Sequence, residues 1–425
     1  MKKKKAPLGR RMKEFVKTSV VWGPLDHNLF FTIIFLNVYG IIMVYSASYN
    51  NSITKNYSYF MNNQLKNVIF GFVIMIVASY VNYHRIVRFG WGWFWLLAAV
   101  AIIAALKTPL AHSELGATRW IKLGPVSFQA AEPIKAAIII FFAYYVSYWG
   151  LNRWYNQLLA CLLAIALLGF LFFFSNNLST VIVLFCICAV IILSSVKKPD
   201  LYLYFLIGLA LIIIAAIGVT IYLLMHQGAE NFRFVRIRAW LHPEEYAADE
   251  GLQAMQARYA IGAGGFWGKG LGQSLIKFKL SYSYNDFILA IICEELGVFG
   301  VIVMMTLFGY LLYRIYKIAQ NAWDIEGKVL AIGVFTQIAL QLLINVMVVT
   351  SVIPTTGVTL PFFSAGGTSV VFLLAELGMV LNVDKYAKER RFFEEAERHV
   401  AQMEQRGGIG VAGWRRRLDS ARTRR

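Results

Sequence analysis

The chain has 425 residues, of which 58% are hydrophobic and only 15% are charged, whereas soluble domains carry about 25% charged residues. A soluble fold this apolar would lack polar residues for its surface, so the composition excludes a soluble globular protein and indicates one that crosses a membrane several times. The formal net charge of +18 is concentrated at the termini and in short connections, as at the cytoplasmic ends of membrane helices, and we expect no nucleic-acid binding.

Ten apolar segments are each long enough to cross a bilayer as a helix, because about 20 residues span its hydrocarbon core. They lie at 28–48, 64–82, 90–107, 132–150, 156–174, 177–195, 201–225, 285–313, 328–350 and 367–384. The first is long for a signal peptide and no small-residue cleavage site follows it, so we expect an uncleaved anchor. The predicted fold is an all-α polytopic membrane domain at 28–384, between a basic N-terminal tail at 1–27 and a charged C-terminal tail at 385–425.

Lysine and arginine residues predict that both ends of the chain face the cytoplasm. The segments that this orientation places inside all carry such residues, for example Arg85 and Arg88 after the second span and Lys197 and Lys198 after the sixth, in agreement with the positive-inside rule. The large loop at 226–284, between the seventh and eighth spans, is then extracellular. Its basic residues break the charge rule, so we expect them to serve another purpose.

Part of this loop, from Ala260 to Gly272, is dense in glycine, which lets backbone N–H groups approach a ligand closely. Successive N–H groups can surround an anion, and Lys269 adds a positive charge beside them. The alternative is a flexible loop at the membrane surface, with Phe266 and Trp267 as interfacial anchors. Spacing alone favours this second interpretation.

Asp286 lies where the loop leads into the eighth span. An acidic residue suits the first turn of a helix, with Ser283 or Asn285 as the N-cap, and this is its ordinary interpretation. At ~1.5 Å per residue Glu294 would lie roughly 12 Å deeper and on the same helix face. Carboxylates within a span mark functional or paired sites. For Glu294 and Glu295, support of a cavity and packed salt bridges are both open.

Two further polar clusters lie on the predicted extracellular side. Arg119 and Lys122, after the third span, are candidates to bind a phosphate group. Lys135, three residues after Glu132, is a candidate partner for a buried carboxylate. Before the tenth span, the apolar segment 356–369 is interrupted by glycine and proline, as in re-entrant segments that line a cavity.

Several catalytic signatures are absent from the sequence. It contains no GxxxxGK[ST] phosphate-binding loop, no HExxH motif and no group of histidines and cysteines at metal-ligand spacing. The four cysteines lie in apolar segments, as packing residues do. Any activity would therefore use carboxylates and cations.

Four motifs resemble those of the SEDS family of peptidoglycan polymerases, whose members serve division, elongation and sporulation. The motifs are GAxRWIxLG…FQxxExxK at 116–135, GxQxxQxxxAIGxGGxxGKGLG at 251–272, DFIxAxxxEELGxxG at 286–300 and TGxTLPFxSxGGxS at 356–369. The TLPF form of the last motif resembles the division and sporulation branch more than the elongation branch. The sequence departs from the family pattern at Ala130, Ala131, Asn177, Tyr284, Asn285 and Ala365.

The resemblance implies a substrate, lipid II, a disaccharide-pentapeptide on undecaprenyl pyrophosphate. It implies polymerisation into β-1,4 glycan strands at the outer face of the bacterial cytoplasmic membrane, at the division septum, with a class B penicillin-binding protein transpeptidase and other divisome proteins as partners. Asp286 is then the expected general base. The cations expected at the pyrophosphate are Arg119, Lys122, Arg236, Lys269 and Lys277. The residues expected to support the cavity are Gln129, Glu132, Lys135, Gln256, Glu294, Glu295, Ser364 and Ser369.

No protein ligand set for a metal is predicted, although a divalent cation such as Mg or Mn could assist departure of the pyrophosphate. Two alternatives to catalysis stay open: a lipid II flippase or other transporter, and a non-catalytic scaffold of the division complex. A transporter should show inverted repeats and broken polar helices near the midplane, and the sequence offers no convincing repeat. The concentration of polar residues around Asp286 favours the polymerase.

Overall fold

The computed structural model describes residues 21, 23–48, 59–109, 111–114, 117–123, 126–175, 177–196, 232–243, 245, 250–278, 285–365 and 367–405. Over these ranges the chain is mostly helical. In chain order its elements are α2 (His27–Ser48), α3 (Tyr59–Tyr80), α4 (Tyr83–Val87), the 3-10 helix η1 (Phe89–Gly92), α5 (Trp93–Ala105), β1 (Ala111–Glu114), β2 (Ala117–Leu123), β3 (Val126–Gln129), α6 (Ala131–Trp149), α7 (Trp154–Ser175), α8 (Leu178–Ser195), α10 (Phe232–Leu241), α11 (Glu250–Gly264), the 3-10 helix η2 (Ile276–Phe278), α12 (Ile288–Gln320), α13 (Ile325–Val349) and α14 (Thr368–Gln405).

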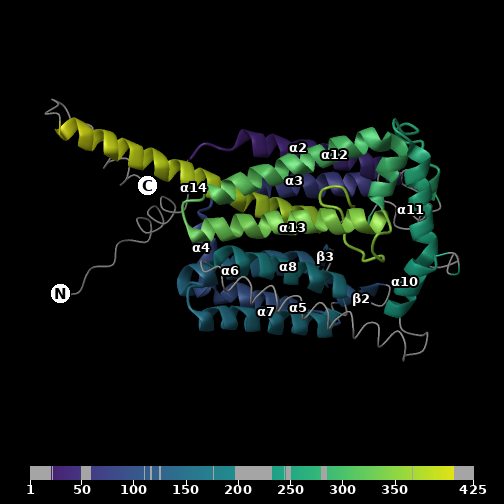
Figure 1. The fold of residues 1–425 in the computed structure, drawn as a ribbon, viewed down its shortest axis with the longest axis horizontal. Helices are drawn as coiled ribbons and strands as arrows, with labels where there is room; N and C mark the ends of the chain where they lie inside the picture. Colours follow the sequence, from purple (N-terminus) through teal and green to yellow (C-terminus); the bar gives the residue numbers. More distant parts are fainter. Residues whose placement is uncertain are drawn as a thin grey trace.

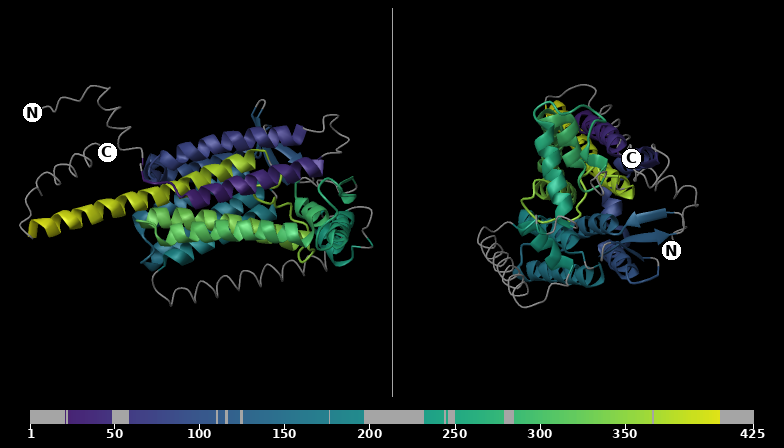
Figure 2. Two further views of the ribbon diagram at one scale, coloured as in Figure 1. Left: turned by 90° about the horizontal axis from the view of Figure 1, so that it is seen from above. Right: turned by 90° about the vertical axis from the view of Figure 1, so that its right-hand side faces the viewer.

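Long helices lying side by side form the body of the molecule (Figure 1). α13 contacts α12, α6, α8 and α14, while α14 packs along α3. The helices α10 and α11 lie across one end of the bundle, and α14 extends beyond the other end (Figure 1). The small sheet lies toward the end that carries α10 and α11 (Figure 2). Polar segments that are far apart in the sequence therefore gather at one end of the bundle.

Six of the described helices are long and apolar enough to cross a membrane, namely α2, α3, α7, α8, α12 and α13. α5, α6 and α14 also coincide with predicted spans, but α5 has only 13 residues and α6 buries Glu132 and Lys135. The predicted span at 201–225 lies outside the described residues. The number of ten spans and the cytoplasmic position of the two ends therefore stay predictions.

The all-α prediction is wrong in one detail. A three-stranded antiparallel sheet in the order β1-β2-β3 occupies the connection between α5 and α6, where the sequence predicts only a loop. Trp120 on the central strand pairs with His112 on one side and with Gln129 on the other. Because α6 begins two residues after Gln129, the sheet fixes this side chain next to the first turn of α6.

Helical spacing in the first part of the C-terminal tail predicts a helix there. In the structure this helix is continuous with the last predicted span, because α14 runs without interruption to Gln405. The arginine-rich end of the tail lies outside the described residues.

A polar cluster joins α4 to the connection between α12 and α13, at the end of the bundle opposite α11 (Figure 1). The Asp324 carboxylate accepts a hydrogen bond from the Tyr83 hydroxyl at 2.6 Å and lies 2.7 Å from Nε2 of His84. It also caps α13 by accepting from the Gly327 N–H at 2.8 Å. Burial alone would raise the pKa of Asp324, but these hydrogen bonds outweigh it and hold the pKa below its usual value.

The variant Asp324→Asn should flatten the loss of stability in acid. Because the folded-state pKa is lowered, ionised Asp324 stabilises the fold above the pKa of the unfolded chain, and this contribution is lost as the pH falls through the folded-state pKa. Asparagine keeps an oxygen that can cap α13 but carries no charge. Thermal unfolding of both proteins between about pH 6 and about pH 3 checks this. An equal drop in unfolding temperature for both would contradict it.

Candidate active site

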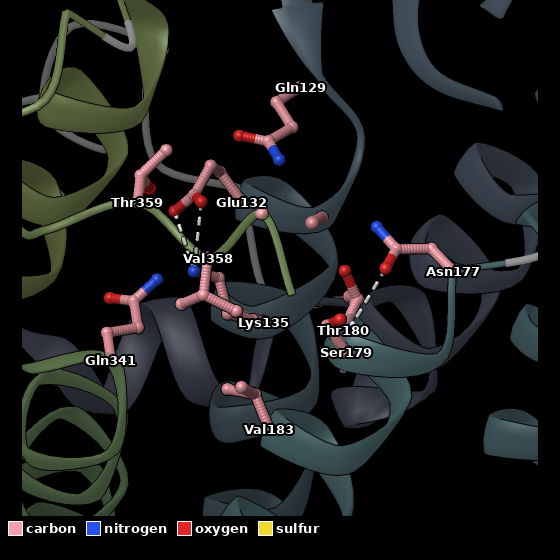
Figure 3. A pocket seen from close by; sticks show the side chains of 12 residues that line it. Gln129, Glu132, Lys135, Asn177, Ser179, Thr180, Val183, Gln341, Val358 and Thr359 are labelled. Atoms are coloured by element: carbon pink, nitrogen blue, oxygen red, sulfur yellow. Dashed lines mark hydrogen bonds and ion pairs between the residues drawn. The ribbon is translucent and has the colours of Figure 1, made fainter. Parts of the chain in front are cut away.

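A polar pocket opens between α6, α8, α13 and the segment that follows α13, with about 350 Å³ of empty space that includes the open solvent at its mouth. Figure 3 shows Glu132 and Lys135 pointing toward one another at its centre. A second hollow of about 270 Å³ shares Glu132, Gln341 and Thr359 with it, and extends it toward Ser364 and Ser369. The other polar residues that line the first pocket are Gln129, Asn177, Ser179 and Thr180.

The two charges in the pocket wall compensate one another. Lys135 Nζ lies 2.9 Å from the Glu132 carboxylate, and both side chains are almost fully buried. Removing one partner of such a pair leaves a buried charge, at a cost of about 3–5 kcal/mol. The remaining polar groups of the wall are amides and hydroxyls, so the pocket offers neutral hydrogen-bond partners of the kind that sugar hydroxyls and amides use.

Asp286 precedes α12 rather than lying in its first turn. The helix begins at Ile288, its N-cap is Phe287, and no side chain caps it. The prediction that Asn285 caps the helix is therefore wrong, and Ser283 lies outside the described residues. Half-buried Asp286 lies in a turn formed by residues 285–287.

All three backbone carbonyls of this turn accept hydrogen bonds. The carbonyl of Asn285 accepts from the Ser364 hydroxyl and that of Asp286 from the Asn345 amide, both at 2.9 Å. The carbonyl of Phe287 accepts from the Ala290 N–H at 2.9 Å. Because Ser364 lines the second hollow, the turn that carries Asp286 is fastened directly to the wall of the pocket.

Glu294 lies inside α12 with no exposed surface. Its carboxylate accepts a hydrogen bond from Lys269 Nζ at 2.7 Å and another from the Ser274 hydroxyl. The backbone N–H groups of Leu275 and Ile276 add two more, at 3.2 and 3.3 Å. A single buried carboxylate thus organises the end of the glycine-rich segment.

Glu295 is equally buried and binds the other side of the same segment. It lies 3.5 Å from Lys277 Nζ, accepts from the Ser274 N–H at 3.3 Å, and accepts from the Ser46 hydroxyl of α2. The geometry therefore supports the salt-bridge alternative for both glutamates. These two residues connect α2, α12 and the segment that follows α11.

The ion pairs with Glu294 and Glu295 change the interpretation of Lys269 and Lys277, two of the predicted pyrophosphate ligands. The Lys277 side chain is only 2% exposed, and its ammonium group also donates to the Gly272 carbonyl at 2.7 Å. The geometry gives a pyrophosphate role for Lys277 no support. The Lys269 side chain is 32% exposed, so its ammonium group binds Glu294 while part of the side chain reaches the surface.

A double-mutant cycle tests whether Lys277 serves only the ion pair with Glu295 or also binds the pyrophosphate. Lys277→Met should destabilise the protein by about 3–5 kcal/mol, because it leaves the Glu295 carboxylate buried without its cation. Adding Glu295→Gln should restore much of that stability and the activity that depends on it. Thermal unfolding and the glycan synthesis expected from the sequence resemblance, measured for the two single variants and the double variant, provide the check. If stability returns while activity does not, Lys277 has a role beyond the ion pair.

From Gly265 to Gly270 the glycine-rich segment is packed into a break in α12, so it is not a loose loop, and the N–H groups of Lys269 and Gly270 donate to carbonyls of α12. Phe266 and Trp267 are exposed, as expected of interfacial anchors. The helix is interrupted at Gly297, which has φ 64° and ψ −163°. Backbone groups on either side of the break bond to the inserted segment, so they remain hydrogen-bonded although the helix is interrupted. The four bonds, 2.9 to 3.1 Å long, run from Lys269 N to Glu294 O, from Gly270 N to Glu295 O, from Val298 N to Gly265 O and from Phe299 N to Phe266 O.

The structure places the other predicted site residues on β2, α10 and α11. Lys122 is exposed on β2 and shares a face of the sheet with Gln129, since it pairs with Ser127. Arg119 and Arg236 lie on β2 and α10, but their side chains are outside the described part of the chain.

Gln256 is half-buried on α11, and it does not line the polar pocket or the second hollow. Sequence reasoning missed Asn345, Gln341 and Thr180. Each of them is a polar residue within an apolar span, and this feature of the sequence could have marked it as a candidate.

Metal binding has no evident donor set in the described residues. They contain no group of three or more histidine, cysteine, aspartate or glutamate side chains placed to hold an ion, and Glu132 is already paired with Lys135. Assistance by a divalent cation therefore stays a prediction.

Comparisons with known proteins agree with one another. The family model for FtsW, RodA and SpoVE, described as "Cell cycle protein", matches residues 26–389. The chain is 32% identical over 374 residues to the probable peptidoglycan glycosyltransferase FtsW of Bacillus subtilis (strain 168), covering 85% of this chain and 91% of the relative. It is also 32% identical over 372 residues to stage V sporulation protein E of the same organism, covering 84% and 96%.

Solved structures support the fold. A chain from a study of polymerisation and crosslinking by a peptidoglycan synthase complex matches with a TM-score of 0.70 at 22% identity, covering 86% of this chain and 98% of that one. The rod shape determining protein RodA of Thermus thermophilus matches with a TM-score of 0.61, also at 22% identity and with the same coverage. The arrangement of helices is therefore shared with these proteins.

Proposed function

The chain belongs to the FtsW/RodA/SpoVE family, and from this premise we propose that it is a peptidoglycan glycosyltransferase that polymerises lipid II. The proposal rests mainly on one observation. Hydrogen bonds to the backbone carbonyls of Asn285 and Asp286 hold Asp286 beside a polar pocket, whose two charged side chains neutralise one another, at one end of a helical membrane bundle. Its relatives named above are a probable peptidoglycan glycosyltransferase and a sporulation protein.

The reaction joins two lipid II molecules. The 4-hydroxyl oxygen of the acceptor GlcNAc attacks C1 of the donor MurNAc, forming a new C–O bond. The bond from C1 to the phosphate oxygen breaks, and undecaprenyl pyrophosphate leaves with its electron pair. Asp286 takes the hydroxyl proton as general base. An α-linked donor becomes a β-linked product, so attack comes from the face opposite the leaving group.

The other residues of the site are proposed to contact different parts of the substrate. The neutral amides and hydroxyls of the pocket suit the sugar and its amide groups, while cations stabilise charge that grows on the leaving pyrophosphate. Lys122 is the exposed candidate for this role. Arg119, on the same strand, and Arg236, on α10, are the other candidates. Lys269 and Lys277 act instead through the glutamates of α12.

The cellular setting follows from the same premise. The end of the bundle with Asp286, α10 and α11 faces outward, both chain ends lie in the cytoplasm, and the protein works in the bacterial cytoplasmic membrane at the division septum. A class B transpeptidase is its partner, in keeping with the peptidoglycan synthase complex that shares this fold.

Proteoliposomes test the proposal against its two rivals. The purified chain, with and without a class B transpeptidase, is given fluorescent lipid II, and both polymer formation and movement of lipid II between leaflets are recorded. We expect polymer. Lipid II movement without polymer would instead support a flippase, and neither activity under both conditions would support a scaffold.

A further inference from the structure

Asn345, on α13, forms the structural link between Asp286 and the pocket. Its side-chain nitrogen donates to the Asp286 carbonyl and to the Val358 carbonyl, each at 2.9 Å. Val358 lines the polar pocket. We propose that Asn345 is a positioning residue for the transferase reaction, which holds the Asp286 turn at a fixed place relative to the pocket wall; this inference rests on the proposed function.

The chemistry of the contact requires an amide at this position. Both neighbours are backbone carbonyls, which only accept hydrogen bonds, so the NH₂ group of Asn345 must face them. One nitrogen with two hydrogens therefore joins two segments that are separated by more than 70 residues in the sequence. An aliphatic residue in its place would leave both carbonyls without this donor.

Asn345 makes both contacts away from solvent, because it has no exposed surface. A buried donor or acceptor left unpaired costs about 1–3 kcal/mol. Replacing Asn345 should therefore destabilise the protein as well as release the Asp286 turn, and the experiment has to separate these two effects.

Ser364 provides a second, parallel fastening. Its hydroxyl donates to the Asn285 carbonyl at 2.9 Å and accepts from the Leu360 N–H at 2.8 Å. Two neighbouring carbonyls of one turn are thus linked to the segment after α13, that of Asn285 directly by Ser364 and that of Asp286 through Asn345. This constrains the direction as well as the distance of Asp286, which matters because a displacement of about 1 Å can cost about 100-fold in rate.

The chain offers a matched control at the opposite end of the bundle. Asn382 on α14 is also fully buried and also links separate elements, since it donates to the Ser79 carbonyl at 2.8 Å and accepts from the Tyr83 N–H at 3.0 Å. Asn382→Ser removes a comparable pair of contacts far from Asp286. Any effect that depends only on folding should appear in both variants.

The experiment compares Asn345→Ser, Asn345→Leu and Asn382→Ser with the wild-type protein. Leucine keeps the number and branching of the side-chain heavy atoms and leaves no cavity, so it remains informative if the smaller serine leaves a harmful one. For each folded protein, kcat and KM for lipid II are measured, and amide hydrogen exchange is followed at Ala290 and Leu360, which report on the turn and on the pocket-lining segment.

Both Asn345 variants should lower kcat about 10- to 100-fold with KM within about 2-fold, and should speed exchange at Ala290 and Leu360, whereas Asn382→Ser should do neither. Equal losses of kcat per folded molecule in all three variants, or unchanged exchange at both amides, would overturn the inference. If the wild-type protein makes no glycan, the proposed function fails, while the exchange data still decide whether Asn345 holds the turn.

Discussion

Gly297→Ala should prevent the protein from folding into a stable membrane bundle. A Cβ at this position would lie 2.4 Å from the Gly268 nitrogen and 2.5 Å from the Phe266 carbonyl oxygen, and the backbone has φ +64°. Neither backbone atom can move away without breaking the hydrogen bonds that join the inserted segment to α12. We expect a loss of more than about 4 kcal/mol, which places this variant among the most damaging single substitutions.

The reciprocal variant and a nearby control define the measurement. At Gly268 an added Cβ would lie 2.2 Å from the Glu295 carbonyl oxygen, so Gly268→Ala should be similarly damaging. At Gly262, inside α11, an added Cβ would meet nothing within 4 Å, and alanine favours a helix over glycine by about 1 kcal/mol. Monodisperse yield and thermal unfolding should therefore separate Gly262→Ala from the other two. Equal unfolding temperatures for all three variants would show that the segment is not inserted as described.

The second large effect is expected at the proposed base. Asp286→Asn keeps the size of the side chain but removes its ability to accept a proton, and general base catalysis contributes about 100- to 10,000-fold. Glycan synthesis should fall at least about 100-fold. Because the turn is held through its backbone carbonyls, the folded amount and the affinity for lipid II should change little.

Asp324→Asn provides the matched control, because it makes the same chemical change in the polar cluster at the other end of the bundle. Rates are compared per folded molecule at near-neutral pH, where Asp324→Asn should keep nearly full activity. If Asp286→Asn retained more than about a tenth of the wild-type rate, Asp286 would not be the base.

Composition and hydropathy predict most of the helices, because an apolar run of span length has few other stable forms in a bilayer. The small sheet was not predictable in the same way. Its strands at 111–129 are short, and their pairing depends on a turn rather than on a long periodic pattern. The sheet matters for the site because it places Gln129 beside the pocket.

The sequence positions of Asp286, Glu294 and Glu295 predict that they form one cluster. They do not predict that Asp286 precedes the helix while the two glutamates form ion pairs within it. Treating Asp286 as helical puts it on one face with Glu294, whereas α12 begins only at Ile288. The partners of the two glutamates come from a segment that folds back onto the helix, and such pairing is set by tertiary structure. Asn345 was overlooked because a single asparagine in an apolar span has no local pattern that reveals its two carbonyl partners.

The most direct measurement of the central claim is the fate of lipid II in a reaction with purified wild-type protein and with Asp286→Asn. Glycosidic bonds and released undecaprenyl pyrophosphate are counted in the same sample. The wild-type protein should release one undecaprenyl pyrophosphate for each new β-1,4 bond, and Asp286→Asn should form almost none of either at an equal folded amount. Similar bond formation by both proteins, or consumption of lipid II without release of undecaprenyl pyrophosphate, would contradict catalysis at this site.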